Sequence, residues 1–109
     1  MKRGEIWTQS GGPGYAGKPR PALIIQSDLL AGTNSVITCL FTSDIGTALP
    51  SRISFIPDEA NGLHDPSDLM ADKITAVSRD KLGTRIGAVS EDEMEQIERA
   101  LLIVLGFAG

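Results

Sequence analysis

The 109-residue sequence contains one cysteine and one histidine, which limits the chemistry open to it. A single cysteine cannot form an internal disulfide. Cys39, in the apolar segment SVITCLFTS, is therefore predicted to be a small buried residue of a reduced, cytoplasmic protein. A metal centre needs several His, Cys, Asp or Glu side chains at ligand spacing, and the sequence offers no such set. We expect neither a disulfide nor a bound metal.

No apolar run approaches the roughly 18 residues of a membrane-spanning helix. The N-terminal segment MKRGE is basic, but it leads into no apolar stretch of the kind found in secretion signals. The sequence also has no internal repeat, low-complexity tract or linker. We predict a single domain spanning residues 1–109, without membrane association.

Motifs of cofactor-dependent and nucleophilic enzymes are missing as well. The glycine-rich segment GGPGYAGK (11–18) has neither the phosphate-loop nor the dinucleotide-binding spacing. No serine lies in the glycine pattern of a nucleophile elbow. His64, in the polar turn NGLHDPSD, is interpreted mainly as a solvated loop residue. We therefore predict that the protein uses no cofactor.

Charge is in slight acidic excess, with a net charge of −4, but it is unevenly distributed. Residues 1–20 contain four Lys and Arg residues and one carboxylate, whereas residues 91–99 contain five carboxylates and one Arg. An acidic total can therefore coexist with a basic face. Because phosphate contacts need clustered Lys and Arg, nucleic acid stays open as a partner.

Short β-type segments separated by Gly, Pro and Asn make up most of the chain. We predict strands at residues 4–9, 21–27, 35–43, 51–57, 68–77 and 84–90. Six short strands favour a small, strongly curved antiparallel sheet or barrel.

The C-terminal segment changes to helical periodicity. Ser90 and Glu93 have the spacing of a capping box, and Gly106 is suited to end a helix. Between them, apolar residues recur at Met94, Ile97, Leu101 and Val104 or Leu105. The fold class is therefore predicted to be mainly β, with one C-terminal helix packed on the sheet.

The segment GKPRP holds an arginine between two prolines at the start of an apolar strand. Pro19 and Pro21 restrict the backbone around Arg20, which suits a functional guanidinium, although prolines at this place can simply mark a loop and a strand start. Lys18 adds positive charge. Tyr15 could stack on a base or could anchor the loop.

Thr42 and Ser43 end the third predicted strand. Hydroxyl groups at a strand end can point into a cleft, and they can equally close a turn. We retain both residues as candidate site residues.

Several motifs together resemble one family. The segments RGEIW, KPRPALII, CLFTSDI, NGLHDPSDLMADKITAVSRDKLG and VSEDEMEQIERAL, in this order, are similar to the MazF/PemK (Kid) family of toxin endoribonucleases. The resemblance implies an SH3-like barrel with a C-terminal helix, the CcdB/MazF-like plasmid maintenance toxin fold. It also implies a homodimer, metal-independent cleavage of single-stranded RNA, and inhibition by a cognate MazE-like antitoxin.

The resemblance also assigns residues. Arg20 matches the arginine of the family's RP motif, and Thr42 matches the threonine that ends the third strand. Asp72 matches a catalytic aspartate of Kid-like members, but Met70 stands where those members have an arginine. The glutamate or histidine that many relatives carry in the first loop is missing, so the general base is not identified.

The reaction that fits these residues is attack of a ribose 2′-OH on the neighbouring phosphorus. It leaves a 2′,3′-cyclic phosphate and a 5′-OH end, and cutting mRNA in this way would inhibit translation and growth. Two alternatives stay open. One is a CcdB-like toxin that poisons gyrase by binding, and the other is a peptide-binding barrel.

Overall fold

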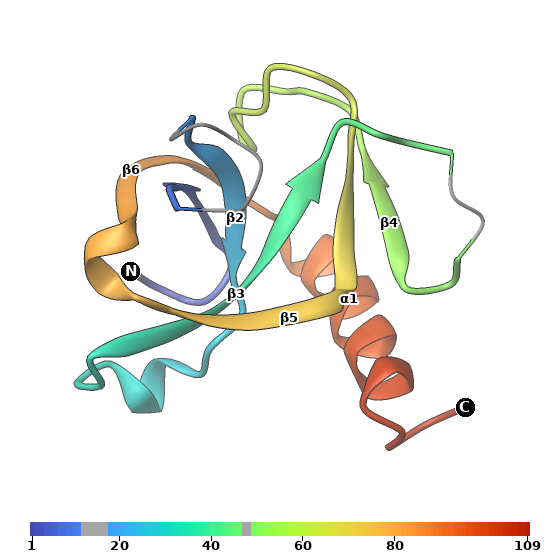
Figure 1. Ribbon diagram of the computed structural model, residues 1–109. Coiled ribbons are helices and arrows are strands. Elements are labelled where there is room, and N and C mark those ends of the chain that lie inside the picture. The colour runs from blue at the N-terminus through green and yellow to red at the C-terminus, as the bar shows by residue number, and fades with distance from the viewer. Residues whose placement is uncertain (12–17, 47–48) are drawn as a thin grey trace.

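A single curved antiparallel sheet carries one helix on its outside (Figure 1). The computed structural model describes residues 1–11, 18–46 and 49–109. Within them the strands are β1 (Glu5–Gln9), β2 (Arg20–Ile24), β3 (Ser35–Thr42), β4 (Arg52–Phe55), β5 (Ser67–Ser78) and β6 (Leu82–Ala88). The helix α1 spans Glu91–Val104, and two short 3₁₀ helices are η1 (Asp28–Leu30) and η2 (Arg79–Lys81). All the predicted strands and the helix are confirmed.

Five of the six strand starts differ from the prediction by one or two residues, and two of these shifts bear on the site. β2 begins at Arg20 because this residue already pairs with Gln9 of β1. β6 begins at Leu82 rather than at residue 84, because Leu82 also pairs with Gln9, on the other side of β1. Arg20 is thus a member of the sheet, and not part of the loop before it.

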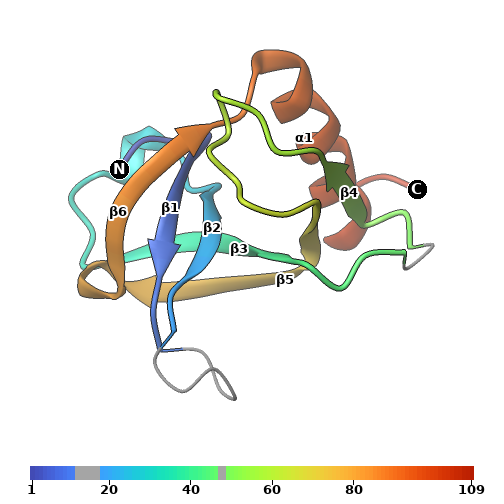
Figure 2. The same cartoon turned by 90° about the horizontal axis from the view of Figure 1, so that it is seen from above.

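The sheet has the strand order β4-β5-β3-β2-β1-β6. It curves into a barrel, and β5 bends within it (Figure 2). Along β3, Cys39 pairs with Ile74 but Phe41 pairs with Leu69, so β5 carries an irregular segment between two paired stretches. Such a bulge bends and twists a strand. As a result the first half of β5 pairs with β4, beside α1, while its second half runs towards η2 and β6 (Figure 2).

The main core lies between the curved sheet and α1. Its buried members are Ile6, Leu23, Cys39, Phe41, Phe55, Leu63, Leu69, Met94 and Ile97. Phe41 and Phe55 meet edge to face with ring centroids 5.4 Å apart, an arrangement favoured by aromatic quadrupoles. A smaller cluster of Ile24, Val36 and Leu82 packs with Trp7 at the other end of the barrel.

Both ends of α1 follow the sequence signals. Ser90 Oγ accepts from the Glu93 amide at 3.1 Å, and Glu93 Oε1 accepts from the Ser90 amide at 2.8 Å, which completes the predicted capping box. Gly106 has a φ of +81°, and the Phe107 amide donates to the Leu102 carbonyl at 2.8 Å. The helix therefore ends in a Schellman-type turn. No helix in the part of the chain that the structure describes is long and apolar enough to cross a membrane.

Candidate active site

A cleft of about 350 Å³ opens where β2 begins and β3 ends. Its polar lining residues are Lys18, Arg20, Ser43, His64, Asp65 and Ser67. Its apolar lining residues are Pro19, Pro21, Phe41, Leu63 and Ile86. We call this space the Arg20 cleft. Its described lining combines two cations, one carboxylate, two serine hydroxyls and one imidazole with apolar side chains.

Arg20 is held by its neighbours on both sides. Its backbone pairs with Gln9 in the β1–β2 ladder, and its side chain is half-buried. Pro19 and Pro21, on either side, also line the Arg20 cleft. The guanidinium is planar and permanently charged, and it can contact two oxygens of one phosphate. The backbone of this arginine is therefore fixed at the wall of the cleft.

The two hydroxyl residues at the end of β3 are placed differently. Ser43 is exposed and lines the Arg20 cleft. Thr42 is buried and is not among the lining residues, and its Oγ1 accepts a hydrogen bond from the Asp44 amide at 3.1 Å. Thr42 thus closes the turn, the simpler of the two readings of the sequence.

Asp72 lies on β5, outside the Arg20 cleft, in an ion pair that the sequence did not predict. Arg52 Nε donates to Asp72 Oδ1 at 2.7 Å, and Arg52 Nη2 donates to Oδ2 at 3.3 Å. Arg52 is the cross-strand partner of Met70. An arginine from β4 therefore stands beside the position at which Kid-like proteins have their own arginine.

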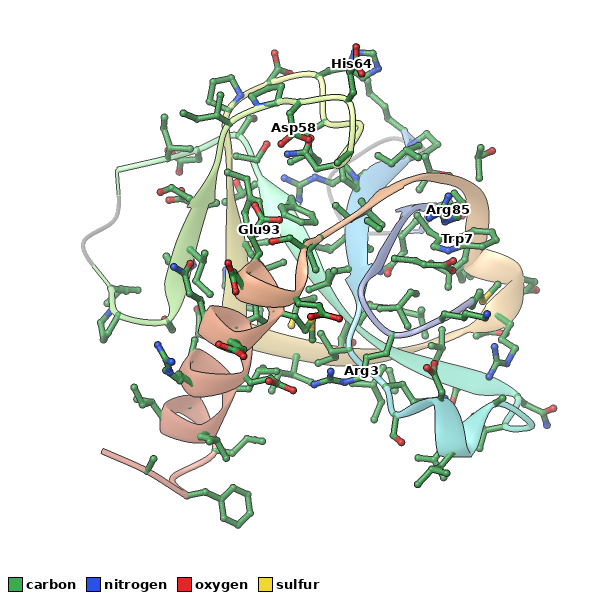
Figure 3. All side chains as sticks on the ribbon, turned by 180° about the vertical axis from the view of Figure 1, so that it is seen from behind. Arg3, Trp7, Asp58, His64, Arg85 and Glu93 are labelled. Atoms are coloured by element: carbon green, nitrogen blue, oxygen red, sulfur yellow. The ribbon has the colours of Figure 1, made fainter. Side chains whose placement is uncertain are left out.

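Lys18 is exposed and lines the Arg20 cleft. Tyr15 lies outside the described residues. The only histidine, His64, joins the cleft from the loop between β4 and β5, where Figure 3 shows it at the outer end of the molecule with Asp58 below it. The sequence placed His64 in a solvated turn and gave no sign that this turn faces Arg20.

A second cleft, of about 400 Å³, lies on the other face of β3. Side chains of neighbouring strand residues point to opposite faces, and Leu40 lines this cleft while Phe41 lines the Arg20 cleft. Lys73 and Lys81 line the second cleft together with Gln9, and no carboxylate is among its described lining residues. Gln9 lines the second cleft and its cross-strand partner Arg20 lines the Arg20 cleft, so the two clefts meet at this end of the β1–β2 ladder.

The ion pair between Arg52 and Asp72 should stabilise the fold in a pH-dependent way. Hydrogen bonds from Arg52 hold the pKa of Asp72 below its usual value of 3.8. A carboxyl group whose pKa is lowered by folding stabilises the protein above its unfolded pKa, and the stabilisation is lost as the pH falls through the folded value. We expect Asp72→Asn to reduce the free energy of unfolding by about 1–2 kcal/mol at pH 7, in line with hydrogen bonds to charged groups that remain partly exposed to water.

Urea unfolding of wild type and Asp72→Asn at pH 7 and at pH 3 checks this prediction. The difference between the two proteins should shrink at the lower pH. Asp80→Asn is the matched control, because Asp80 is an exposed aspartate of η2, and its change should stay within about 0.5 kcal/mol. An Asp72→Asn protein as stable as wild type at pH 7 would contradict the role of the pair.

Comparison with known proteins points to one family. The profile described as "PemK-like, MazF-like toxin of type II toxin-antitoxin system" matches residues 2–105. A protein of Mycolicibacterium smegmatis named "Probable endoribonuclease MazF" is 45% identical over 109 residues, covering 100% of both chains. "Endoribonuclease MazF9" of Mycobacterium tuberculosis is 30% identical over 114 residues, covering 96% of each chain.

Solved structures agree with the predicted barrel. A mycobacterial endoribonuclease in complex with its cognate antitoxin matches with a TM-score of 0.82 at 25% identity, over 100% of this chain and 98% of that one. A MazE–MazF complex from Deinococcus radiodurans matches with a TM-score of 0.78 at 20% identity, over 97% and 96%. The latter likeness concerns the fold alone. The expected barrel with its C-terminal helix is confirmed.

Proposed function

Because the chain belongs to the PemK-like, MazF-like toxins of type II toxin–antitoxin systems, we propose that it is an endoribonuclease that cleaves single-stranded RNA in the Arg20 cleft. The observation that carries this proposal is the placement of Arg20 on one wall of a cleft that also holds Lys18 and Ser43. A cleft with two cations suits a phosphodiester, and its size suits one or two nucleotides rather than a duplex.

The reaction is an internal transesterification. The ribose 2′-oxygen forms a bond to the adjacent phosphorus and loses its proton, while the bond from phosphorus to the 5′-oxygen breaks and that oxygen gains a proton. The products are a 2′,3′-cyclic phosphate and a 5′-OH end. Arg20 stabilises the charge on the five-coordinate phosphate, where preorganised donors have their largest effect. The Thr42 hydroxyl donates to the phosphate or positions the 2′-OH.

Specificity for RNA follows from this chemistry, because the nucleophile belongs to the substrate. No protein nucleophile and no metal ion is needed. Lys18 and Ser43 are proposed to bind the RNA, with Tyr15 available for base stacking. Asp72, held by Arg52 outside the Arg20 cleft, would act on a part of the RNA that extends beyond that cleft.

Two protein partners are proposed. A cognate MazE-like antitoxin would place an extended acidic segment over the cations of the Arg20 cleft, since a related mycobacterial endoribonuclease has been solved with its antitoxin. A second copy of the chain would cover the apolar end of α1, where Leu102, Ile103, Leu105 and Phe107 are exposed. The toxin released from its antitoxin would act in the cytoplasm, where its mRNA substrates are. The CcdB-like alternative is not favoured, because the family match is to the PemK and MazF toxins.

Cleavage of a long single-stranded RNA in excess EDTA tests the proposed function. Purified protein should cut the RNA and leave cyclic-phosphate and 5′-OH ends, which are identified by end labelling before and after phosphatase and kinase treatment. A matched oligonucleotide with 2′-deoxyribose at the scissile position should resist cleavage. Cutting of that oligonucleotide would refute the mechanism. No cutting of any RNA by the folded protein would refute the function.

A further inference from the structure

The loop between β4 and β5 is built around one buried asparagine. Asn61 is 2% exposed, and its Oδ1 accepts from the amides of Asp58 at 3.1 Å and Leu63 at 3.0 Å. Its Nδ2 donates to the Ile56 carbonyl at 2.9 Å, and its own amide donates to Asp58 Oδ1 at 2.7 Å. Every polar group of the Asn61 side chain is therefore used to fix the path of the loop.

The same loop is docked against β6. The Ala88 amide donates to the Ala60 carbonyl at 2.8 Å. Gly62 has a φ of +67°, and a Cβ atom placed there would lie 2.0 Å from the carbonyl oxygen of Ile86. Leu63, the next residue, is buried in the main core. The backbone is thus anchored immediately before His64.

The residues after His64 are fixed as well. Ser67 Oγ donates to the Asp65 carbonyl at 2.8 Å, and Ser67 begins β5. His64 therefore projects from a short exposed segment between two anchored points. Its side chain lines the Arg20 cleft from the β4–β5 loop, while Arg20 lines it from β2. Two separate parts of the fold thus bring an imidazole and a guanidinium to one cleft.

The other described groups that line the cleft are poor proton acceptors at neutral pH. Lys18 and Arg20 are cations and have no lone pair to offer. Asp65, from the same loop as His64, is the only carboxylate among the described residues of the lining, and carboxylates are weak bases at pH 7. Phe41 from β3 and Ile86 from β6 are apolar. An imidazole exchanges a proton between pH 5 and 8, which is the range in which a general base must work.

We propose that His64 is the general base of this ribonuclease. This inference rests on the proposed function, because it names the group that takes the 2′-OH proton in that reaction. One imidazole nitrogen accepts the proton as the 2′-oxygen attacks phosphorus. The departing 5′-oxygen takes a proton from solvent, and the imidazolium afterwards returns its proton to solvent. His64 supplies from the β4–β5 loop the base that the first loop does not provide.

His64→Ala and His64→Gln test the assignment in the full-length protein, in EDTA, under single-turnover conditions. Both variants should cleave RNA at least about 10²-fold more slowly than wild type, which is the lower end of the typical contribution of a general base. Their affinity for an RNA with 2′-deoxyribose at the scissile position should change less than threefold. Added imidazole should restore part of the activity of His64→Ala. The wild-type rate should depend on pH through the protonation of its base, and His64→Gln should lose this dependence.

Glu59→Ala is the matched control, since Glu59 is an exposed residue of the same loop that does not line the cleft. It should cut at the wild-type rate, and all three variants should melt at the wild-type temperature because His64 and Glu59 are exposed. If wild type cuts RNA and His64→Ala cuts equally fast, or loses rate only through weaker binding, the assignment of His64 is overturned while the function stands. If wild type cuts no RNA, the proposed function itself falls.

Discussion

Arg20→Ala should lower the single-turnover rate of RNA cleavage by about 10²–10³-fold, the loss seen when a preorganised donor to a developing negative charge is removed. Arg20 is the cation that β2 and its flanking prolines hold at the wall of the cleft. Without Arg20, Lys18 is the one Lys or Arg left among the described residues that line the cleft. Lys18 is exposed and precedes β2. Rates are measured with a short RNA that contains one mapped cleavage site.

Arg20→Lys separates charge from geometry. A lysine keeps the positive charge but cannot bind two phosphate oxygens in one plane, so most of the loss should remain. Arg85→Ala is the control, because Arg85 is an exposed arginine of β6 that pairs with Glu5 at 3.0 Å and does not line the cleft. It should cut at close to the wild-type rate. Near-normal cleavage by Arg20→Lys would contradict two-oxygen binding of the phosphate by Arg20.

Gly62→Ala should lower the free energy of unfolding by about 2–5 kcal/mol, a large effect for one methyl group. Two costs combine. A φ of +67° disfavours any L side chain by roughly 1–2 kcal/mol, and an overpacked site costs about 1–3 kcal/mol more. The clash is with the backbone oxygen of Ile86, which no side-chain rotation can relieve. Urea unfolding at one fixed protein concentration measures the effect.

Gly106→Ala isolates the backbone contribution. Gly106 also has a positive φ, of +81°, but a Cβ atom there would have nothing within 4 Å. Its substitution should cost only about 1 kcal/mol. If both variants lose the same stability, the close approach of the β4–β5 loop to β6 contributes nothing, and the rigid mount of His64 would have to be reconsidered.

Local patterns predicted the elements because their causes are local. The capping box of Ser90 and Glu93 depends on residues within one helical turn, and the helix begins where the pattern places it. Arg20 was recognised because its restraints, Pro19 and Pro21, are its neighbours in the chain. Strand alternation likewise needs no knowledge of the partner strand.

The contents of the Arg20 cleft and its surroundings depend on contacts that the sequence does not encode locally. The pairing of Arg52 with Asp72 needs the register of β4 on β5, which joins residues 20 positions apart. His64 reaches the cleft only because Asn61 and Gly62 dock its loop on β6. The Asn-Gly pair before the histidine in NGLHDPSD indicated a tight turn. The strand against which this turn packs could not be predicted from the same residues.

Thr42 and Ser43 show the same limit at a single strand end. The sequence offered two adjacent hydroxyls, and alternation allows only one to share the face of Phe41. In the structure Ser43 lies on that face, whereas Thr42 Oγ1 accepts a hydrogen bond from the Asp44 amide. The strand twist at the last residue of β3 decides which of the two hydroxyls can reach a phosphate. This twist depends on the whole barrel, so the local sequence does not predict it.

The single cysteine offers a way to watch the barrel open. Burial, reinforced by the charge of Asp72, raises the pKa of the Cys39 thiol to about 12, and its side chain is fully inaccessible. The thiolate is the nucleophile that reacts with alkylating reagents, so the folded protein should be inert to maleimide at neutral pH. Labelling of Cys39 would then occur only during excursions in which β3 separates from its neighbours. The rate at which the protein gains the mass of the maleimide therefore measures how often the barrel opens. In addition, a fluorophore can be attached to a new cysteine at the cleft without removing the native one.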